Sequence, residues 1–385
     1  MKTVKSRGRR TARVAVASAA FIAMACTAVV GGIGQAGAST QAERASGAAA
    51  CNGKSATSIS NFVKAAEKEP KKLLYAKSIN KKIPTGLTID TITSGTPNDQ
   101  VYISFYKQAA KALGWHLDVL STDGTAQQLQ NAWEQILRQK PAGVMIEPIL
   151  PYSDFSTYVN QAKAQGTVTA AATGTLYPGL IYIAPAAQTD ALIGKADAYW
   201  VANNINTTGQ TNAGSVFLDV PEIPEFATEY NAYQSTLKSL CPGINAGTLN
   251  VSVASLQQAP TQTISYLRAN PNTKYVMYAT DGFFVGLAQA IKSAGLTVDT
   301  VGDAPTSANV TDIQSGVQTA SIANDYGQQA LSLVDSIVRH VAKVRVPAPS
   351  VYPSWIITQK NVGQYKNLSV VPNPIKDYKI LWGKG

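Results

Sequence analysis

The stretch that decides the fold is YATDGFFVGLAQAIKSAG, which occupies residues 278–295 of the 385-residue chain. It starts at the end of an apolar run, Tyr275–Tyr278, that is typical of a buried strand. A polar turn, Asp281-Gly282, comes next, and the helical segment after it ends at Gly295, where a left-handed cap residue is expected. A strand, a polar turn and a helix in this order form the repeating unit of a parallel α/β sheet.

The same alternation of strands and helices extends from Leu87 towards the C-terminus. The clearest helix covers residues 125–139, because its apolar residues recur at i, i+3, i+4 and i+7 and make one buried face that includes Trp133. Gly114 and Gly166 also stand between a helical stretch and a strand and are expected to be left-handed caps. The predicted fold class is α/β with parallel sheets, and the chain is long enough for two domains. The predicted strands lie near residues 87–93, 116–120, 143–146, 168–172, 215–218, 249–253, 275–278 and 320–323.

The N-terminus has the layout of a secretory signal peptide. Six basic residues precede an uncharged, Ala- and Val-rich run from Val14 to about Val30, and Ala36-Gly37-Ala38 supplies the small residues of a cleavage site. Residues 1–38 are therefore predicted to be removed from an exported protein. Two alternatives stay open, namely lipid attachment at Cys26 and twin-arginine export through Arg9-Arg10.

The net charge of +10 comes from 33 Lys and Arg against 23 Asp and Glu. Six of these basic residues lie in the predicted signal peptide, which has no acid, so the mature chain keeps 27 basic residues and a net charge of +4. This small excess removes the main argument for nucleic-acid binding.

Seven lysines lie between Lys64 and Lys82, in a predicted N-terminal extension at residues 39–84. We interpret them as a solvated face, with a membrane surface or a partner protein as the alternative.

Two cysteines, Cys51 and Cys241, remain after removal of the leader, in a compartment where thiols oxidise. A disulfide between them is a candidate, but sequence separation says nothing about distance in space, so the pairing stays open. The only histidines are His116 and His340, and no Cys/His pair is closely spaced. The sequence therefore predicts neither a metal site nor a cofactor.

Polar residues follow the predicted strands at the points where each strand ends. In an open parallel sheet the ligand lies beyond the carboxyl ends of the strands, so these loops are the candidate binding surface. Asp123, Asp281 and Asp325 also stand directly before predicted helices, and an N-cap role without ligand contact is the alternative for each. An enzyme is not expected, because no Ser or Cys nucleophile has an evident base partner and closely spaced acids in one loop are weak support for glycoside hydrolysis.

In their order these motifs resemble the type I periplasmic binding proteins, close to the ribose- and galactose-binding branch, whose fold is shared by LacI-type sensory domains. The resemblance covers about residues 85–358 and is most specific over the stretch quoted above, followed by Val301-Gly302-Asp303 and by residues 316–327. It implies two Rossmann-like lobes joined by a three-crossing hinge. The crossings are expected near Ala187, Asn324 and Ser350. The predicted first lobe comprises residues 85–187 and 325–350, and the predicted second lobe comprises residues 188–324 and 351–385.

The resemblance implies an extracellular solute-binding protein of an ABC importer, which captures a small polar, sugar-like ligand between the lobes and delivers it to a permease. A monomer is expected, and a DNA-binding regulator is not, because the leader occupies the place of a helix-turn-helix. Presentation of the bound molecule to a membrane sensor kinase stays open as the alternative.

In the family, an aspartate matching Asp281 and a polar side chain matching Asn324 bond to the ligand, and the loop after the first strand adds contacts. The candidate ligand-binding residues are Thr96, Asn98, Asp99, Glu147, Tyr152, Thr173, Asp219, Phe226, Asp281 and Asn324.

The chain departs from the family's sugar-binding pattern at two places. Ala172-Thr173 stands where the sugar binders carry an Asp-Arg pair, and Ala227 occupies the position of a further arginine. We expect the acidic and apolar loop 219–226 to replace these groups, together with Glu147 and Tyr152. Acids without a nearby arginine suit a cationic or polyhydroxylated ligand, and the aromatic rings in this set either stack on that ligand or only pack.

Overall fold

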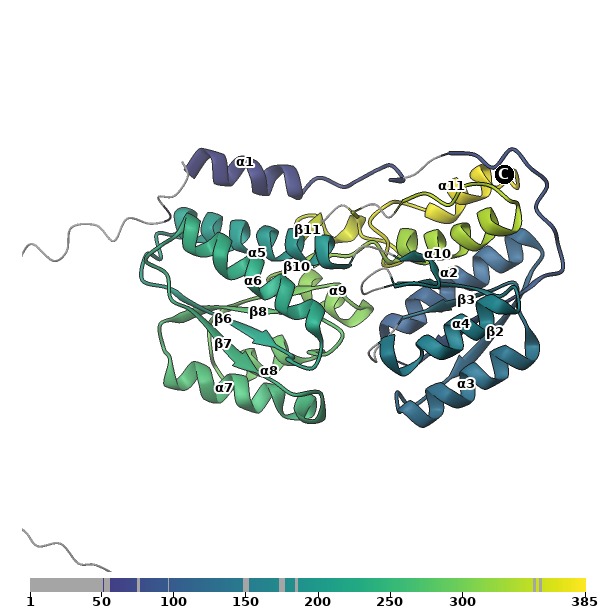
Figure 1. Ribbon diagram of the computed structural model, residues 1–385. Coiled ribbons are helices and arrows are strands. Elements are labelled where there is room, and N and C mark those ends of the chain that lie inside the picture. Colours follow the sequence, from purple (N-terminus) through teal and green to yellow (C-terminus); the bar gives the residue numbers. More distant parts are fainter. Residues whose placement is uncertain are drawn as a thin grey trace, which may run out of the picture. The chain divides into compact units, whose positions relative to one another are not determined.

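The computed structural model describes residues 51, 56–74, 77–95, 97–147, 152–172, 177–183, 186–348, 351–352 and 355–385. The predicted signal peptide, its cleavage site and Cys26 lie outside the described residues, as do Thr96, Thr173, Ser350 and the side chain of Asn98. The described chain folds around two β-sheets with helices packed on them (Figure 1). The first lobe is defined here as sheet A with its helices, and the second lobe as sheet B with its helices.

Sheet A has five strands, all parallel, in the order β2-β1-β3-β4-β5. The elements of the first lobe are β1 (Thr88–Thr93), α2 (Pro97–Leu113), β2 (His116–Ser121), α3 (Ala126–Gln139), β3 (Gly143–Ile146), η1 (Tyr152–Asp154), α4 (Ser156–Ala164), β4 (Val168–Ala171), β5 (Leu180–Ile183) and α10 (Tyr326–Val341). Successive residues of β3 serve opposite faces, as a strand requires. Met145 packs among residues of α2 and α10, whereas Val144 and Ile146 pack among residues of α3 and α4. Both faces of sheet A are therefore covered.

Sheet B has six strands in the order β11-β10-β9-β8-β6-β7, all parallel except β11, which is antiparallel to β10. The elements of the second lobe are α5 (Ala186–Thr208), β6 (Gly214–Asp219), α6 (Pro224–Leu240), β7 (Ala246–Asn250), η2 (Val253–Gln258), α7 (Ala259–Ala269), β8 (Thr273–Tyr278), α8 (Leu287–Ser293), β9 (Asp299–Asp303), α9 (Ser307–Gln314), β10 (Ala320–Ala323), β11 (Trp355–Thr358) and η3 (Val362–Gln364). α5 and α6 pack closely because Gly194 has no side chain, and a Cβ there would lie 2.1 Å from the carbonyl oxygen of Glu229. Neither α5 nor any other described helix is long and apolar enough to cross a membrane.

The chain passes between the lobes after β5, after β10 and after α10, close to the three expected crossings. The tail differs from the expected division, which grouped residues 351–385 with the second lobe. α11 (Pro374–Leu381) contacts α10 and α2 of the first lobe, and Trp382 Nε1 donates to Asp335 Oδ1 at 2.8 Å. The tail returns because Tyr378, Leu381 and Trp382 bury their apolar surface in the core of the first lobe.

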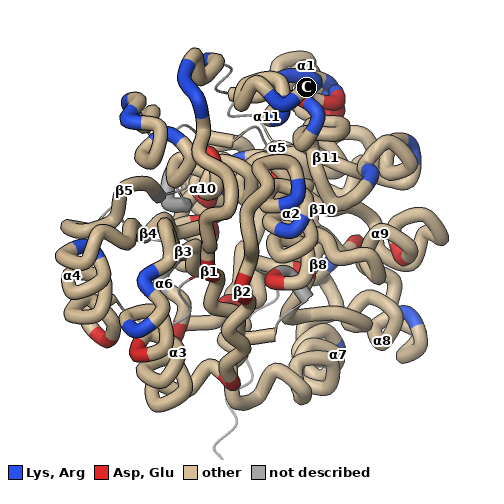
Figure 2. Tube along the Cα trace, turned by 90° about the vertical axis from the view of Figure 1, so that its right-hand side faces the viewer, with Lys and Arg blue, Asp and Glu red and all other residues tan. Residues whose placement is uncertain are grey.

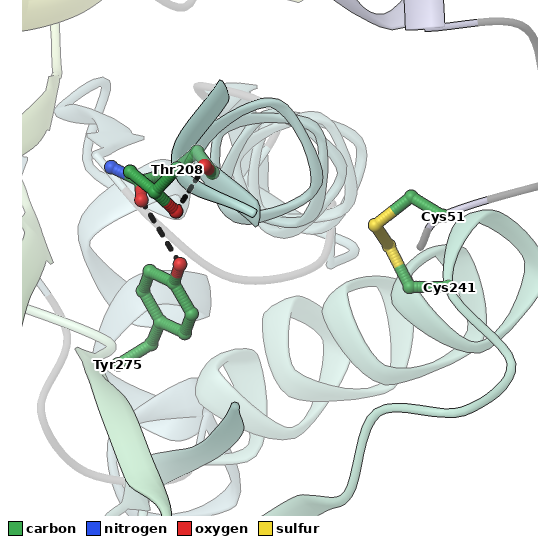
Figure 3. The surroundings of a disulfide bond; sticks show 5 residues. Cys51, Thr208, Cys241 and Tyr275 are labelled. Carbon is green, nitrogen blue, oxygen red and sulfur yellow. Dashed lines mark hydrogen bonds between the residues drawn. A yellow bond between two sulfur atoms is a disulfide. The ribbon is translucent and has the colours of Figure 1, made fainter. Parts of the chain in front are cut away.

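The N-terminal extension is ordered against the second lobe where the structure describes it. α1 (Ala56–Ala66) packs on α5, and Cys51, just before it, is joined to Cys241 at the end of α6 by a disulfide (Figure 3). The carbonyl oxygen of Glu67 then accepts from Trp355 Nε1 at 3.0 Å and from Asn361 Nδ2 at 3.1 Å. The pairing that the sequence leaves open thus anchors the start of the extension.

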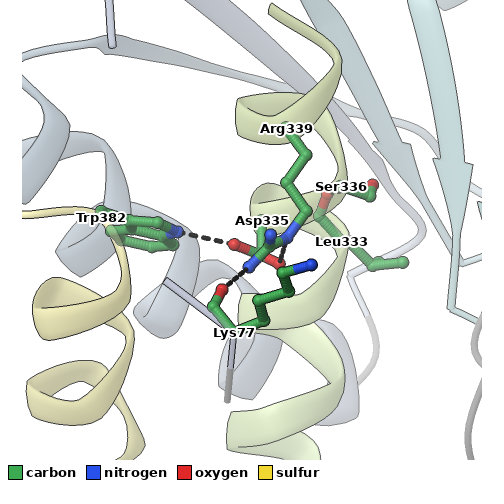
Figure 4. Close-up of polar contacts among 6 residues, drawn as sticks. All are labelled: Lys77, Leu333, Asp335, Ser336, Arg339 and Trp382. Atoms are coloured by element: carbon green, nitrogen blue, oxygen red, sulfur yellow. Dashed lines mark hydrogen bonds and ion pairs between the residues drawn. The ribbon is translucent and has the colours of Figure 1, made fainter. Parts of the chain in front are cut away.

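The extension continues onto the first lobe. Arg339 of α10 is buried and donates through Nε to Asp335 Oδ2 and through an Nη atom to the carbonyl oxygen of Lys77, each at 2.6 Å (Figure 4). Ile79 N donates to Leu381 O at 2.7 Å, and Lys81 Nζ donates to the carbonyl oxygen of Lys343. The same chain segment therefore docks on both lobes.

The strands that the sequence misses or displaces have weak apolar patterns. β9 lies inside sheet B, but its sequence, DTVGD, includes the polar residues Thr300 and Asp303, which are buried. It therefore lacks the apolar run by which a buried strand is recognised. β5 and β11 are edge strands of four residues, and β7, another edge strand, lies three residues before the predicted position. The glycine caps are confirmed, with φ of 68° at Gly114, 91° at Gly166 and 72° at Gly295.

Asp90 is a buried acid within the core of the first lobe. It is paired in register with Asp118 of β2, its side chain is 0% exposed, and neither carboxylate oxygen has a donor among the described residues. Burial raises the pKa of Asp90 to about 7, with the charge of Asp118 adding to the rise and that of His116 opposing it. The folded protein therefore holds a proton on Asp90 that the unfolded chain releases.

We predict that the double variant Cys51→Ser, Cys241→Ser loses about 2–5 kcal/mol of unfolding free energy, because the disulfide restricts the unfolded chain. Chemical denaturation measures the loss, and hydrogen exchange should show faster exchange in α1 than in sheet B. Reducing agent should destabilise the wild type and leave the double variant unchanged. Unchanged exchange in α1 would contradict an anchoring role.

A second prediction concerns pH. Because the folded pKa of Asp90 is raised, its contribution to stability is fully present below the unfolded pKa near 4 and is lost as the pH rises through about 7. Asp90→Asn mimics the protonated acid, so its unfolding free energy should match wild type at pH 4 and exceed it increasingly up to pH 7, by at most about 1.4 kcal/mol per pH unit. Glu134→Gln, in α3 outside the buried core, is the control. Parallel stability curves for wild type and Asp90→Asn would refute the assignment.

Candidate functional site

In each sheet the strand order reverses direction at one place, where the carboxyl ends of two neighbouring strands leave room for a ligand. In sheet A this place lies between β1 and β3, and Asp99 and Glu147 follow these strands. In sheet B it lies between β6 and β8, at Asp219 and Asp281. Predicted site residues therefore lie at the point in each sheet where the strand order reverses.

Asp99 and Glu147 form a carboxyl pair on the first lobe. Asp99 is buried in the first turn of α2, and its Oδ2 accepts from Thr93 Oγ1 at 2.8 Å and from Ser94 N at 2.9 Å. Burial raises the pKa of Glu147 well above its usual range, and its hydrogen bond to Asp99 and the charge of Asp99 raise it further. The shift favours the protonated form of Glu147, and its buried Oε2 has no donor among the described residues.

Asp219 opens the acidic and apolar loop of the second lobe. Its buried Oδ1 has no donor among the described residues, and burial raises its pKa, with a backbone hydrogen bond from Val220 opposing the rise. Glu222 Oε1 accepts from Val253 N at 3.3 Å. The ring of Phe226 packs edge-on against Phe283 with centroids 5.9 Å apart, which is the packing role that the sequence leaves open.

The second lobe also holds a group of buried acids that the candidate set omits. Asp303 ends β9 and is 6% exposed, Asp197 belongs to α5 and Glu229 to α6. Each has one oxygen without a donor among the described residues. Burial, followed by the charges of neighbouring acids, raises the pKa of all three well above the usual range. Asp303 ends the Val301-Gly302-Asp303 motif, but only the position of β9 in the sheet places it at the carboxyl edge and makes it a candidate site residue.

The first residue of α10 lies close to the carboxyl ends of both sheets. Tyr326 is buried, and its hydroxyl donates to the carbonyl oxygen of Ala304 in the second lobe at 3.2 Å. Burial raises the pKa of Tyr326, and the charges of Asp303 and Glu147 are among the groups that raise it further. Ala304 directly follows Asp303, so the start of α10 lies beside the end of β9. The ring of Tyr102 packs edge-on against it at 5.5 Å.

Asn324 occupies the second crossing, just before α10. Its Oδ1 accepts from Asp325 N at 2.9 Å and from Gln329 Nε2 at 2.5 Å, and its carbonyl oxygen accepts from Tyr365 OH at 3.0 Å. Its Nδ2 donates to no described residue. The hinge therefore offers one amide donor whose orientation is fixed by the bonds on the neighbouring oxygen.

Asp281 lies in a polar network inside the second lobe. It is 0% exposed, and its oxygens accept from Asn309 Nδ2 at 2.9 Å, Gln318 Nε2 at 2.8 Å and Ser321 Oγ at 2.6 Å. Burial raises its pKa to about 7 although these donors oppose the rise. The network ties the loop after β8 to α9 and β10. A direct ligand contact of Asp281 stays a prediction, and it needs this network to open.

The capping expectations have different outcomes. Asp325 caps α10, with its side chain accepting from Gln328 N at 3.1 Å. Asp123 is not the cap of α3, because Thr125 takes that position and Asp123 Oδ1 accepts from Thr125 N at 3.0 Å. Asp281 is not a cap either, since α8 begins at Leu287.

Tyr152 lies beside other aromatic residues of the first lobe. Its hydroxyl donates to the carbonyl oxygen of Pro178 at 2.5 Å, and its ring stacks on Tyr177 with centroids 4.2 Å apart.

A separate groove of about 720 Å³ lies beside α2 and is lined by residues such as Phe105, Val285 and Thr306. None of the predicted site residues lines that groove.

Comparison with known families matches residues 93–343 to the family described as periplasmic binding protein domain. No curated protein matches the chain. Among solved structures, an ABC transporter solute-binding protein from Agrobacterium vitis with bound allitol superposes with a TM-score of 0.61 at 17% identity, covering 73% of this chain and 98% of that one. A periplasmic solute-binding protein from Actinobacillus succinogenes with bound D-allose gives 0.62 at 16% identity, covering 72% and 100%. A carbohydrate transporter solute-binding protein from Agrobacterium radiobacter in complex with D-arabinose gives 0.63 at 16% identity, covering 74% and 99%.

We predict that Asp281→Ala lowers the unfolding free energy by about 2–4 kcal/mol, because three buried donors lose their acceptor. Chemical denaturation measures the loss. Asp312→Asn, on the partly exposed part of α9, is the control and should change stability by less than about 0.5 kcal/mol. A stable Asp281→Ala variant that loses only ligand affinity would support the direct contact instead.

Proposed function

The chain belongs to the periplasmic binding protein family, and from that premise we propose that it is the solute-binding component of an ABC importer. In this role it captures a small polar ligand between its two lobes and delivers it to a membrane permease. The observation that carries the proposal is the contact between the lobes at the second crossing, where the Tyr326 hydroxyl donates to the carbonyl oxygen of Ala304, next to Asp303, and the Tyr326 ring packs against Tyr102 of α2. Polar groups from both lobes can then bond to one bound molecule.

The three crossings support a mechanism in which the lobes open and close. A ligand that bonds to both lobes favours the closed state by the difference between its affinities for the two states. The hydroxyl of Tyr326 already joins α10 to the loop after β9. The permease then recognises the closed, loaded form.

The proposed ligand class is sugar-like. The similar structures named above hold allitol, D-allose and D-arabinose, and carboxyl and amide groups such as Asp99 and Asn324 suit molecules with several hydroxyl groups. No catalytic step is proposed, because the function requires only reversible binding.

Export of the mature protein is part of the proposal. The Cys51–Cys241 disulfide supports an oxidising compartment, since such bonds persist outside the cytosol. The protein is proposed to act as a single copy, with the permease as its partner.

The proposal predicts that a sugar, sugar alcohol, nucleoside or amine raises the melting temperature of the purified mature protein. A ligand at 100 times its dissociation constant adds about 2.7 kcal/mol to the unfolding free energy, because it binds the folded state alone. A thermal-shift screen measures the rise, and the disulfide-free double variant serves as a control for folding effects. If no member of these classes shifts the transition, the proposed function fails.

A second prediction addresses the hinge. Asn324→Ala removes the amide donor at the crossing, and ligand affinity should fall by about 1–3 kcal/mol when a hydrogen-bonding partner is lost. Calorimetry measures the change with the ligand found in the screen. Asn131→Ala, at an exposed position of α3, is the matched control. Equal affinities for the two variants would place the ligand away from the second crossing.

A further inference from the structure

The segments that leave the carboxyl ends of the strands contain acids but no base. Between each of the strands β1 to β10 and the element that follows it, the sequence has no Lys, Arg or His. Basic residues instead stand in the last turns of α2, α3, α4, α6, α7, α8 and α10, at the opposite edges of the sheets. Figure 2 shows Asp and Glu beside β1, β2 and β8, and Lys and Arg mainly on the outer helices and segments. Lys195, in the first half of α5, lies 5.7 Å from the ring centroid of Phe62 and so faces α1.

The acids at the carboxyl ends are not satisfied by the protein itself. Asp303 Oδ1 in the second lobe and Glu147 Oε2 in the first are buried and have no donor among the described residues, and Asp219 Oδ1 is in the same state. A buried acceptor without a donor costs about 1–3 kcal/mol. The two acids are linked through Tyr326, whose hydroxyl donates to the carbonyl oxygen of Ala304, next to Asp303. The Tyr326 ring packs on Tyr102, which lies one turn of α2 after Asp99, the hydrogen-bond partner of Glu147. The unbonded carboxyl oxygens therefore favour a ligand that carries several hydrogen-bond donors.

Resting on the function proposed above, we propose that the ligand is a hydroxylated amine, such as an amino sugar or amino polyol, whose ammonium group binds between Asp303 and Glu147. The ammonium group donates to the carboxyl oxygens of both lobes and supplies the positive charge that the site lacks. The rings of Tyr326 and Tyr102 form an apolar wall beside it.

The alternatives supply less. A neutral polyol donates hydrogen bonds but brings no charge that would stabilise the ionised forms of Asp219, Asp303 and Glu147, whose pKa values are raised by burial. A metal ion is not favoured, because no three His, Cys, Asp or Glu side chains among the described residues are arranged to hold one. An ammonium group meets both requirements, since it carries three donors and one positive charge.

The proposal fixes how binding depends on pH. Burial raises the pKa of Glu147 and of Asp303, with Asp99 adding to the first rise and Asp190, Asp197 and Asp281 adding to the second, so both shifts favour the protonated acids in the free protein. A bound ammonium group stabilises the ionised carboxylates and expels protons. Affinity for the amine should therefore rise from pH 5 to pH 7, while affinity for a neutral sugar should change little.

The test compares matched pairs on the wild-type protein by calorimetry: glucamine with sorbitol, glucosamine with glucose, and galactosamine with galactose. The amine of at least one pair should bind about tenfold more tightly than its neutral partner, which is about 1.4 kcal/mol. Titrations of that amine in buffers of different ionisation enthalpy should show proton release. A neutral partner that binds as tightly as its amine overturns the inference and leaves the proposed function standing. Failure of all six compounds overturns the inference, and the broader thermal-shift screen then decides the proposed function.

Two variants locate the ammonium group. Asp303→Asn and Glu147→Gln should each weaken binding of the amine about tenfold and reduce the proton release, with little effect on the neutral partner. Asp377→Asn, in α11, changes the same charge away from the site and should leave both affinities unchanged. Equal losses for the amine and its neutral partner would contradict an ammonium site, and the wild-type comparison remains decisive if either variant folds poorly.

Discussion

Parallel strands bring all their carboxyl ends to one edge of a sheet, and this constraint governs the protein. It places Asp99 and Glu147 together in the first lobe, and Asp219 and Asp303 at the corresponding edge of the second. These residues are far apart in the sequence and come together only through strand order. Because α10 begins directly after β10, Tyr326 packs on Tyr102 of the first lobe and bonds to the carbonyl oxygen of Ala304 in the second. Binding chemistry therefore follows from topology, and the helices serve mainly to bury the sheets.

The same topology also determines how the two lobes are connected. The chain crosses between them three times, and the crossing after β10 carries Asn324, whose bonds to Asp325, Gln329 and Tyr365 fix its orientation. The N-terminal extension and α11 add contacts away from this crossing. The extension is held to the second lobe by the disulfide and to the first by Arg339, while α11 docks on α10 and α2. These segments lie outside residues 93–343, the region that the family model matches.

The sequence predicts the α/β class and most strands of both sheets, because apolar runs, polar turns and glycine caps are local signals. Prediction from the sequence fails where the local signal is weak. β9 is a central strand with polar residues, and α11 packs on helices that lie far away in the chain. The candidate site shows the same division. Asp99, Glu147 and Asp219 can be proposed from the sequence because they follow recognisable strands, and their ligand contacts stay predictions. Asp303 is absent from the candidate set because β9 has no apolar run, and the network around Asp281 cannot be foreseen, because its donors come from α9, β10 and the segment between them.

The central claim is that one ligand bonds to both lobes and draws their carboxyl edges together. Spin labels at Gln127 of α3 and Gln257 of η2, both exposed and each at the carboxyl edge of its own sheet, report this directly. Pulsed electron resonance should show a shorter and narrower distance distribution when the tightest ligand saturates the protein. A distribution that is the same with and without that ligand would contradict capture between the lobes.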